Sequence, residues 1–290
     1  MLALRTVLCP VDFSAATDRQ ADVARDLCRA FGARLVLHHN VSALAPGAGV
    51  GWMWAADQHA PPEATVEDRL RALLARVSDD TPAEARVTHG PASESVMVVA
   101  ESVDADVVVL STHGGSSDDH ASVTECVLER ARRAVLALHD PGADRSTPRF
   151  ASAGGPVQVA VVPTDLTPES RAAIELAFDL SRRLPIEIHL LHVLPGGERA
   201  GGMGGAAAEA RRRLSGLIED SSTTRATIHV EVGDPVAGIV RTATELGASC
   251  IVMGEHTRAS LRRWFSRDTS RAVLHRAPCP VWYVPGQRVA

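Results

Sequence analysis

The sequence of 290 residues contains no lysine, so all 30 of its basic residues are arginines. This absence excludes the lysine of a phosphate-binding P-loop, a lysine that forms a Schiff base and the strand lysine of a protein kinase. Any phosphate that this chain binds must therefore be held by backbone N–H groups, hydroxyl groups or arginine side chains.

Long apolar runs and blocks of one charge are missing as well. No apolar run reaches the roughly 18 residues needed to cross a bilayer, and the start of the sequence resembles a strand, not a signal peptide. The formal net charge of −5 is spread along the chain, and no basic block is present to attract nucleic acid. The five cysteines show no close pairing, which favours reduced, buried thiols. We therefore expect a cytoplasmic protein without a membrane or nucleic-acid partner.

The two halves of the sequence repeat one another. Four segments correspond in order: Cys9–Asp12 with Val162–Asp165, His39 with His192, His113 with His256, and Ser122–Val135 with Asp268–Val281. The separation is 153 residues for the first two pairs, 143 for the third and 146 for the fourth. The middle loop is therefore longer in the first half, and the last loop of that half is shorter by three residues. A repeat of this length is typical of a duplicated domain.

Each half alternates strand patterns with helix patterns. In the first half we expect strands at Thr6–Val11, Leu35–Val41, Ala85–His89, Val107–Ser111 and Ala134–His139, and helices at Ala15–Phe31, Thr65–Val77, Ser93–Val103 and Ser122–Arg132. In the second half we expect strands at Val157–Val162, Ile186–Val193, Thr227–Val232, Cys250–Gly254 and Val281–Val284, and helices at Glu169–Arg183, Ala206–Glu219, Pro235–Glu245 and Asp268–His275.

Several of these strands are apolar throughout, as expected when helices cover both faces of a parallel sheet. The pattern predicts an α/β fold of two tandem Rossmann-like domains, each a five-stranded parallel sheet flanked by helices. We place the first domain at residues 1–140, a linker rich in Pro, Gly and Ser at 141–156, and the second domain at 157–290.

Four motifs together resemble the universal stress protein family over nearly the whole chain. They are Pro-x-Asp after the first strand of each half, Leu190-Leu191-His192-Val193, the turn Gly233-Asp234-Pro235, and the tail Ala272–Trp282. The family commonly pairs the last strands of two units. The resemblance therefore implies that Leu136–Leu138 pairs with Val281–Val284 to form an intramolecular pseudo-dimer, and a homodimer of whole chains is a further expectation.

The resemblance also implies a ligand, ATP or another adenine nucleotide, with no metal beyond the Mg²⁺ that accompanies it. In ATP-binding members the fourth strand runs into G-x-x-G, nine residues and then G-[ST] at a helix start. Glycines let backbone N–H groups approach the phosphates, and the helix N-terminus attracts their charge. The Asp after the first strand contacts the adenosine, and backbone near the end of the second strand holds the base.

The second half matches the adenosine side of this site and departs from its phosphate side. The residues that match are Pro163, Thr164, Asp165, Val193 and Gly254. After Gly254 and His256, however, Thr257 replaces the second glycine, and Arg267-Asp268 replaces the G-[ST] pair. We expect Asp268 to cap the following helix and so to compete with a phosphate, whereas Arg267 would pair with one.

The first half keeps Pro10, Val11 and Asp12, but Asn40 stands where the other half has Val193. Its loop keeps Gly114 after His113, with Ser111 in place of the first glycine and Ser122 in a passable G-[ST] equivalent. Neither half carries the complete ATP motif, and we expect a nucleotide in at least one of them.

Three other interpretations are weighed against this one. His38, His39, His189 and His192 are interpreted as core or strand-end histidines with one hydrogen bond each, a metal site being the alternative. No motif places a general base and no G-x-S-x-G elbow is present, so we expect no enzymatic turnover and rank ATP hydrolysis last. The first hypothesis is a regulatory nucleotide-binding protein, and the second is a protein-interaction module that has lost the nucleotide. The loop Trp52-Met53-Trp54 either binds a regulatory protein partner, forms a lid or folds back onto its own domain.

Overall fold

The structure is a computed structural model that describes residues 4–41, 63–112, 123–139, 157–194, 196, 203–219, 226–255 and 267–286. The first half contains strands β1 (Thr6–Val11), β2 (Arg34–Val41), β3 (Ala83–His89), β4 (Val107–Thr112) and β5 (Ala134–His139), and helices α1 (Thr17–Phe31), α3 (Glu63–Val77), α4 (Ala92–Ser102) and α5 (Val123–Arg130). The second half contains β6 (Gln158–Pro163), β7 (Ile186–Leu194), β8 (Ala226–Val232), β9 (Cys250–Glu255) and β10 (Val281–Pro285), with the 3₁₀ helix η1 (Pro168–Ser170), α6 (Arg171–Arg183), α7 (Met203–Glu219), α8 (Pro235–Glu245) and α9 (Arg267–Arg276).

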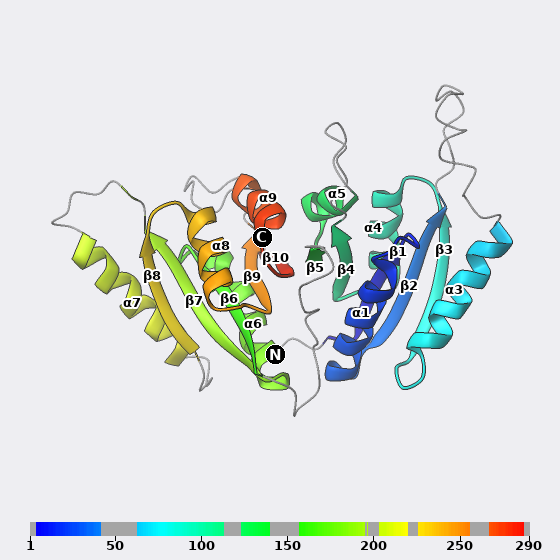
Figure 1. The fold of residues 1–290 in the computed structure, drawn as a ribbon, viewed down its shortest axis with the longest axis horizontal. Coiled ribbons are helices and arrows are strands. Elements are labelled where there is room, and N and C mark those ends of the chain that lie inside the picture. Colours follow the sequence, from blue (N-terminus) through cyan, green and yellow to red (C-terminus); the bar gives the residue numbers. More distant parts are fainter. Residues whose placement is uncertain are drawn as a thin grey trace, which may run out of the picture.

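The ten strands form one sheet in the order β3-β2-β1-β4-β5-β10-β9-β6-β7-β8 (Figure 1). Among the described strands, all neighbours within each half run parallel, and the one antiparallel pair joins β5 to β10 at the centre. The predicted pair of five-stranded Rossmann-like units, joined through their last strands within one chain, is therefore confirmed. The domain boundaries at 1–140 and 157–290 stay a prediction.

Helices cover both faces of the sheet because side chains alternate along each strand. On β1, Val7 and Cys9 pack with apolar residues of α1 and α3, whereas Leu8 packs with those of α4 and α5. The second half repeats the arrangement, with α6 and α7 on one face and α8 and α9 on the other. The two apolar layers explain why the buried strands read as continuous apolar runs.

The register at the centre is short and apolar. Val281 pairs with Ala137, Trp282 with Leu136, and Tyr283 with Val135. Leu136 and Trp282 are fully buried, so water is excluded from the junction of the halves. The junction therefore belongs to the core of the molecule.

Two helix boundaries differ from the prediction in ways that matter for the site. Helix α5 ends at Arg130, two residues earlier than expected. Helix α9 begins at Arg267, so Asp268 lies in its first turn and does not precede the helix as expected. By contrast, Asp234 does cap α8, because its carboxylate accepts a 2.8 Å hydrogen bond from the backbone N–H of Ala237. Among the described helices, none is long and apolar enough to cross a membrane.

Candidate functional site

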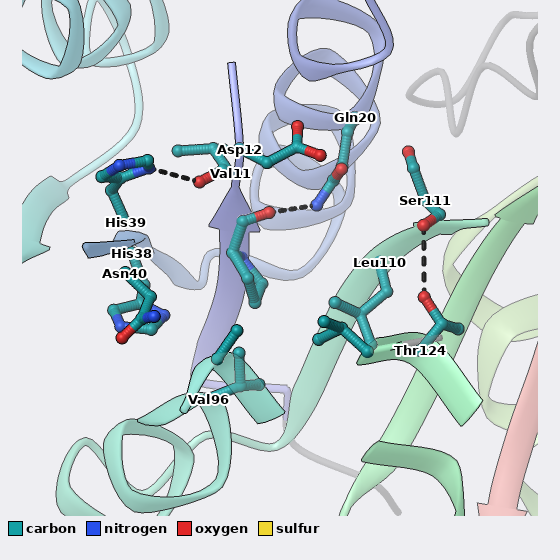
Figure 2. Close-up of a pocket in the computed structure, with 13 residues that line it drawn as sticks. Val11, Asp12, Gln20, His38, His39, Asn40, Val96, Leu110, Ser111 and Thr124 are labelled. Carbon is teal, nitrogen blue, oxygen red and sulfur yellow. Dashed lines mark hydrogen bonds between the residues drawn. The ribbon is translucent and has the colours of Figure 1, made fainter. Parts of the chain in front are cut away.

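A cavity of about 220 Å³ opens in the first half at the carboxyl ends of β1, β2 and β4 (Figure 2). It is lined by Pro10, Val11, Asp12, Gln20, His38, His39, Asn40, Ala92, Val96, Leu110, Ser111, Val123 and Thr124. It lies between β1 and β4, where the strand order changes direction, since β2 and β3 follow on one side and β5 on the other. Open parallel sheets generally bind ligands at this point.

Five predicted site residues line this cavity together: Pro10, Val11, Asp12, Asn40 and Ser111. The other three predicted for this half, His113, Gly114 and Ser122, lie outside the described residues. Each of the five residues stands at or next to the carboxyl end of a strand. The carboxyl ends of parallel strands lie at the same edge of the sheet, so the five residues lie close together.

Gln20 bridges strands β1 and β4 at the floor of the cavity, and the sequence did not identify it as a site residue. Strands β1 and β4 pair only at Val7–Val107 and Leu8–Val108, and beyond these pairs they separate. The side-chain amide of buried Gln20 spans the gap: its Nε2 donates to the carbonyl of Pro10 at 2.5 Å (Figure 2). The same nitrogen donates to the carbonyl of Val109 at 2.8 Å.

One signal for Gln20 was available in the sequence. It is a large polar residue on the face of α1 that otherwise buries Ala21, Ala24, Leu27 and Cys28. A buried amide requires hydrogen-bond partners, and free carbonyls at the end of a strand supply them. The equivalent position in the second half, 153 residues later, is Ala173.

Asp12 is fixed by the turn that follows β1. Its Oδ1 accepts hydrogen bonds from the backbone N–H of Ser14 at 2.9 Å and from the hydroxyl of Thr17 at 3.3 Å. Asp165 repeats this turn in the second half, where its Oδ1 accepts from the N–H and the hydroxyl of Thr167 at 3.0 and 2.7 Å. The local turn thus sets the orientation of the carboxylate at both strand ends.

The residue after each of these aspartates has a left-handed backbone. Phe13 has φ of 59° and Leu166 has φ of 62°, a conformation that costs a side-chain-bearing residue free energy. In both halves an arginine from a neighbouring helix donates to the carbonyl of that residue, Arg69 to Phe13 at 3.2 Å and Arg213 to Leu166 at 2.6 Å. The guanidinium groups therefore help to hold both turns in place.

The wall of the cavity near the end of β2 is a chain of hydrogen bonds. Asn40 Nδ2 donates to the carbonyl of Gly90 at 2.8 Å, the hydroxyl of Thr88 donates to Asn40 Oδ1 at 3.2 Å, and His38 Nε2 lies 2.7 Å from the same hydroxyl. The carbonyl of Gly90 can only accept, so the amide nitrogen of Asn40 faces it and Asn40 Oδ1 accepts from the hydroxyl of Thr88. The oxygen of this hydroxyl is then left to accept, and His38 must donate to it through Nε2–H. Burial, with a smaller effect of neighbouring His39, lowers the pKa of His38 to about 4, which keeps the ring neutral.

The two strand-end histidines behave as predicted. His39 Nδ1 lies 2.8 Å from the carbonyl of Val11, and His192 Nδ1 lies 2.7 Å from the carbonyl of Thr164. Each ring thereby connects the second strand of its half to the end of the first strand, at its last residue, Val11, or at the residue that follows it, Thr164. No group of three or more potential metal ligands occurs among the described residues.

The second half has a different wall at the matching place. The positions of His38 and Asn40 are taken by Leu191 and Val193, both buried. Helix α8 approaches closely there, because a Cβ on Gly238 would lie only 3.0 Å from Val193 Cγ2. The space around Val193 is therefore tightly packed, with Glu231 Oε2 3.4 Å from the same Cβ position.

The remaining predicted residues of the second half are only partly gathered. Thr164 is fully buried, and its hydroxyl is engaged by Ser170 Oγ at 2.7 Å and by the N–H of Leu166 at 3.0 Å. Pro163 ends β6, Gly254 lies in β9, and Arg267 begins α9. His256 and Thr257 fall outside the described residues.

The cysteines are placed in the core. Cys9, Cys28, Cys250 and Cys279 are buried and Cys126 is half-buried, and all five are free thiols. Burial raises the pKa of the Cys28 and Cys250 thiols to about 12, so these sulfurs stay protonated and unreactive.

Comparison with known proteins agrees with this arrangement. A universal stress protein of Mycobacterium tuberculosis (strain ATCC 25618 / H37Rv) is 28% identical over 195 residues, which is 63% of this chain and 63% of that protein. The crystal structure of a universal stress protein from Archaeoglobus fulgidus DSM 4304 matches with a TM-score of 0.74 at 18% identity, covering 98% of this chain and 97% of the other. A putative universal stress protein from Pseudomonas aeruginosa UCBPP-PA14 matches with a TM-score of 0.68 at 15% identity, covering 98% and 94%.

At such identities the solved structures show the fold alone, and the match to the curated relative spans 63% of that protein's length. The family model is more extensive, because the model of the universal stress protein family matches residues 3–139 and again residues 157–285. The chain therefore belongs to the universal stress protein family and carries one copy of the family domain in each half.

Proposed function

We propose that this chain is a regulatory protein that binds an adenine nucleotide in the cavity of its first half and does not turn it over. The observation that supports this most is the position of the cavity, at the point where the strand order reverses, with Pro10, Val11, Asp12 and Ser111 on its lining. Nucleotide binding would then shift the conformation that the protein presents to a partner.

Two helix N-termini favour a phosphate at this cavity. Ala92 and Val123, the first residues of α4 and α5, both belong to its lining. The first turn of α4 has no side-chain cap, because the residue before it is Pro91. Backbone N–H groups at helix starts are free to bind anions, which suits a chain without lysine.

The proposed absence of turnover rests on His38, which lines the cavity. His38 is a poor general base near neutral pH, since its lowered pKa leaves little driving force for taking a proton.

In the second half, the fully engaged hydroxyl of Thr164 and the tight packing between Val193 and Gly238 disfavour a ligand. We therefore place the nucleotide in the first half. We extend the proposal to a cytoplasmic homodimer that signals occupancy to a regulatory protein partner.

The test compares two matched aspartates. Purified protein is denatured and its supernatant is examined for adenine absorbance, and the protein is then titrated calorimetrically with ATP, ADP, AMP, cyclic AMP and GTP. Asp12→Ala is expected to weaken binding of the preferred adenine nucleotide at least about tenfold, whereas Asp165→Ala, at the matching turn of the second half, leaves binding unchanged. Binding of no adenine nucleotide, or equal effects of the two substitutions, would overturn the proposal; complete absence of binding would favour the protein-interaction hypothesis.

A further inference from the structure

A buried glutamate joins the two halves. Glu125 on α5, whose side chain is only 10% exposed, accepts from Arg271 on α9 through both oxygens, at 2.9 Å from Nε and 3.0 Å from Nη2. His275 Nε2, one turn further along α9, lies 3.0 Å from the same carboxylate. The two helices flank the central strands β5 and β10 (Figure 1).

The register of the central strands shows how the halves are related. Positions in this part of the chain correspond at a separation of 146 residues, so Leu136 is the equivalent of Trp282. These two residues are also register partners, and the pairs on either side of them are exchanged in the same way. A two-fold pseudo-axis therefore passes through the Leu136–Trp282 pair. Around such an axis, a contact from one position to another is matched by the reverse contact.

The charges around this axis do not follow its symmetry. Glu125 is the equivalent of Arg271, and Glu129 is the equivalent of His275. Both positions are thus acidic on α5 and basic on α9. If the first halves of two chains paired through β5, Glu125 of each would face Glu125 and Glu129 of the other. If two second halves paired through β10, Arg271 would face Arg271 and His275.

We propose that this charge difference makes the central interface specific for unlike halves: the first half accepts a domain with basic residues at the positions of Arg271 and His275 and rejects a copy of itself. The strand backbones alone do not discriminate, since β5 offers the same edge to β10 and to another β5. The burial of Glu125 reduces the screening of its charge by salt, although the side chains of Arg271 and His275 are 61% and 59% exposed. Joining the halves in one chain favours their pairing through an effective concentration on the order of millimolar, but does not stop halves of neighbouring chains from competing.

A cysteine on the pseudo-axis reports pairing between like halves. In the full chain with Leu136→Cys, the new thiol faces Trp282 when the halves of one chain pair. When two first halves pair, it faces its own copy and forms an intermolecular disulfide under mild oxidation. The chain without the new cysteine gives the background from the five native thiols.

The charge variants are compared on this reporter chain. Neutralisation by Glu125→Gln with Arg271→Gln is expected to raise the disulfide-linked dimer at least about fivefold. The matched control, Arg171→Gln with Glu175→Gln, neutralises an exposed ion pair within α6 and is expected to leave the dimer at the level of the parent.

Exchanging the charges at both positions, with Glu125→Arg, Glu129→His, Arg271→Glu and His275→Glu, is expected to return the dimer to the low level of the parent. Equal dimer in the parent and the neutral variant, or no recovery on exchange, would overturn the proposal.

Leu136 is fully buried, so the folding of each variant is checked first by its unfolding midpoint. If Leu136→Cys does not fold, a mixture of an Ala137→Cys chain with a Val135→Cys chain replaces it. These two positions face each other in a pair of first halves, as Ala137 faces Val281 within one chain. The same outcomes then support or overturn the proposal.

Discussion

His38 should make the stability of this protein fall in mildly acidic solution. Its ordinary pKa of 6.5 applies to the unfolded chain, whereas in the fold burial lowers the pKa to about 4. Between these values the unfolded chain binds a proton that the folded chain refuses, so stability decreases as the pH falls through this window. For one group with these two pKa values, the loss between about pH 7.5 and about pH 5 is about 2 kcal/mol.

The perturbation that isolates this contribution is His38→Gln. Glutamine does not titrate, and its amide can still donate toward Thr88. The variant is therefore expected to lose about 2 kcal/mol less than the wild type between about pH 7.5 and about pH 5. Urea unfolding followed by circular dichroism at each pH measures the difference, in which the contributions of the other 11 of the 12 histidines cancel.

His89→Gln provides the matched control, because it removes an exposed histidine at the end of β3. Its free energy of unfolding should change with pH in parallel with that of the wild type. If His38→Gln also ran parallel to the wild type, to within about 0.5 kcal/mol, the desolvated, neutral ring inferred from the hydrogen-bond chain would be refuted.

Two further predictions concern the packing of side chains and the hydrogen bonds of buried polar groups. Gln20→Ala should cost about 1–3 kcal/mol in the free energy of unfolding, because the carbonyls at the ends of β1 and β4 lose their shared buried donor; an unchanged urea midpoint would contradict this. Gly238→Ala should destabilise the second half by about 1–3 kcal/mol, because the new methyl group would lie 3.0 Å from Val193. Gly216→Ala in α7 should instead raise the melting temperature, because no packing neighbour lies within 4 Å of its new methyl group. Equal shifts for the two glycines would refute the close contact.

The elements could be predicted almost entirely from the sequence, for a physical reason. A parallel sheet buried on both faces requires apolar strands, and each helix requires an apolar stripe, so β1, β5 and α8 were predicted with the bounds that the structure has. The pairing of β5 with β10 was predicted from the resemblance to a family, because the sequence of an apolar edge strand does not specify the strand with which it pairs.

The candidate site could be predicted only where a residue stands at a strand end. Asp12 and Asn40 were found in this way. Gln20 and Thr88 were not, because their roles depend on contacts with residues 89 and 48 positions away, which no local pattern contains. The role of Glu125 was not predicted for the same reason, since its partners lie 146 and 150 residues further along the chain.

The order in which the strands are synthesised gives the central junction a further consequence. Strand β10 follows every other strand in the sequence, yet it lies in the middle of the sheet. While the ribosome is still making the second half, the first half has already emerged with the backbone groups of β5 exposed as a second open edge. Truncated mRNAs that end within the second half would yield proteins in which this edge stays exposed, and exposed strand edges pair with other strands and cause aggregation.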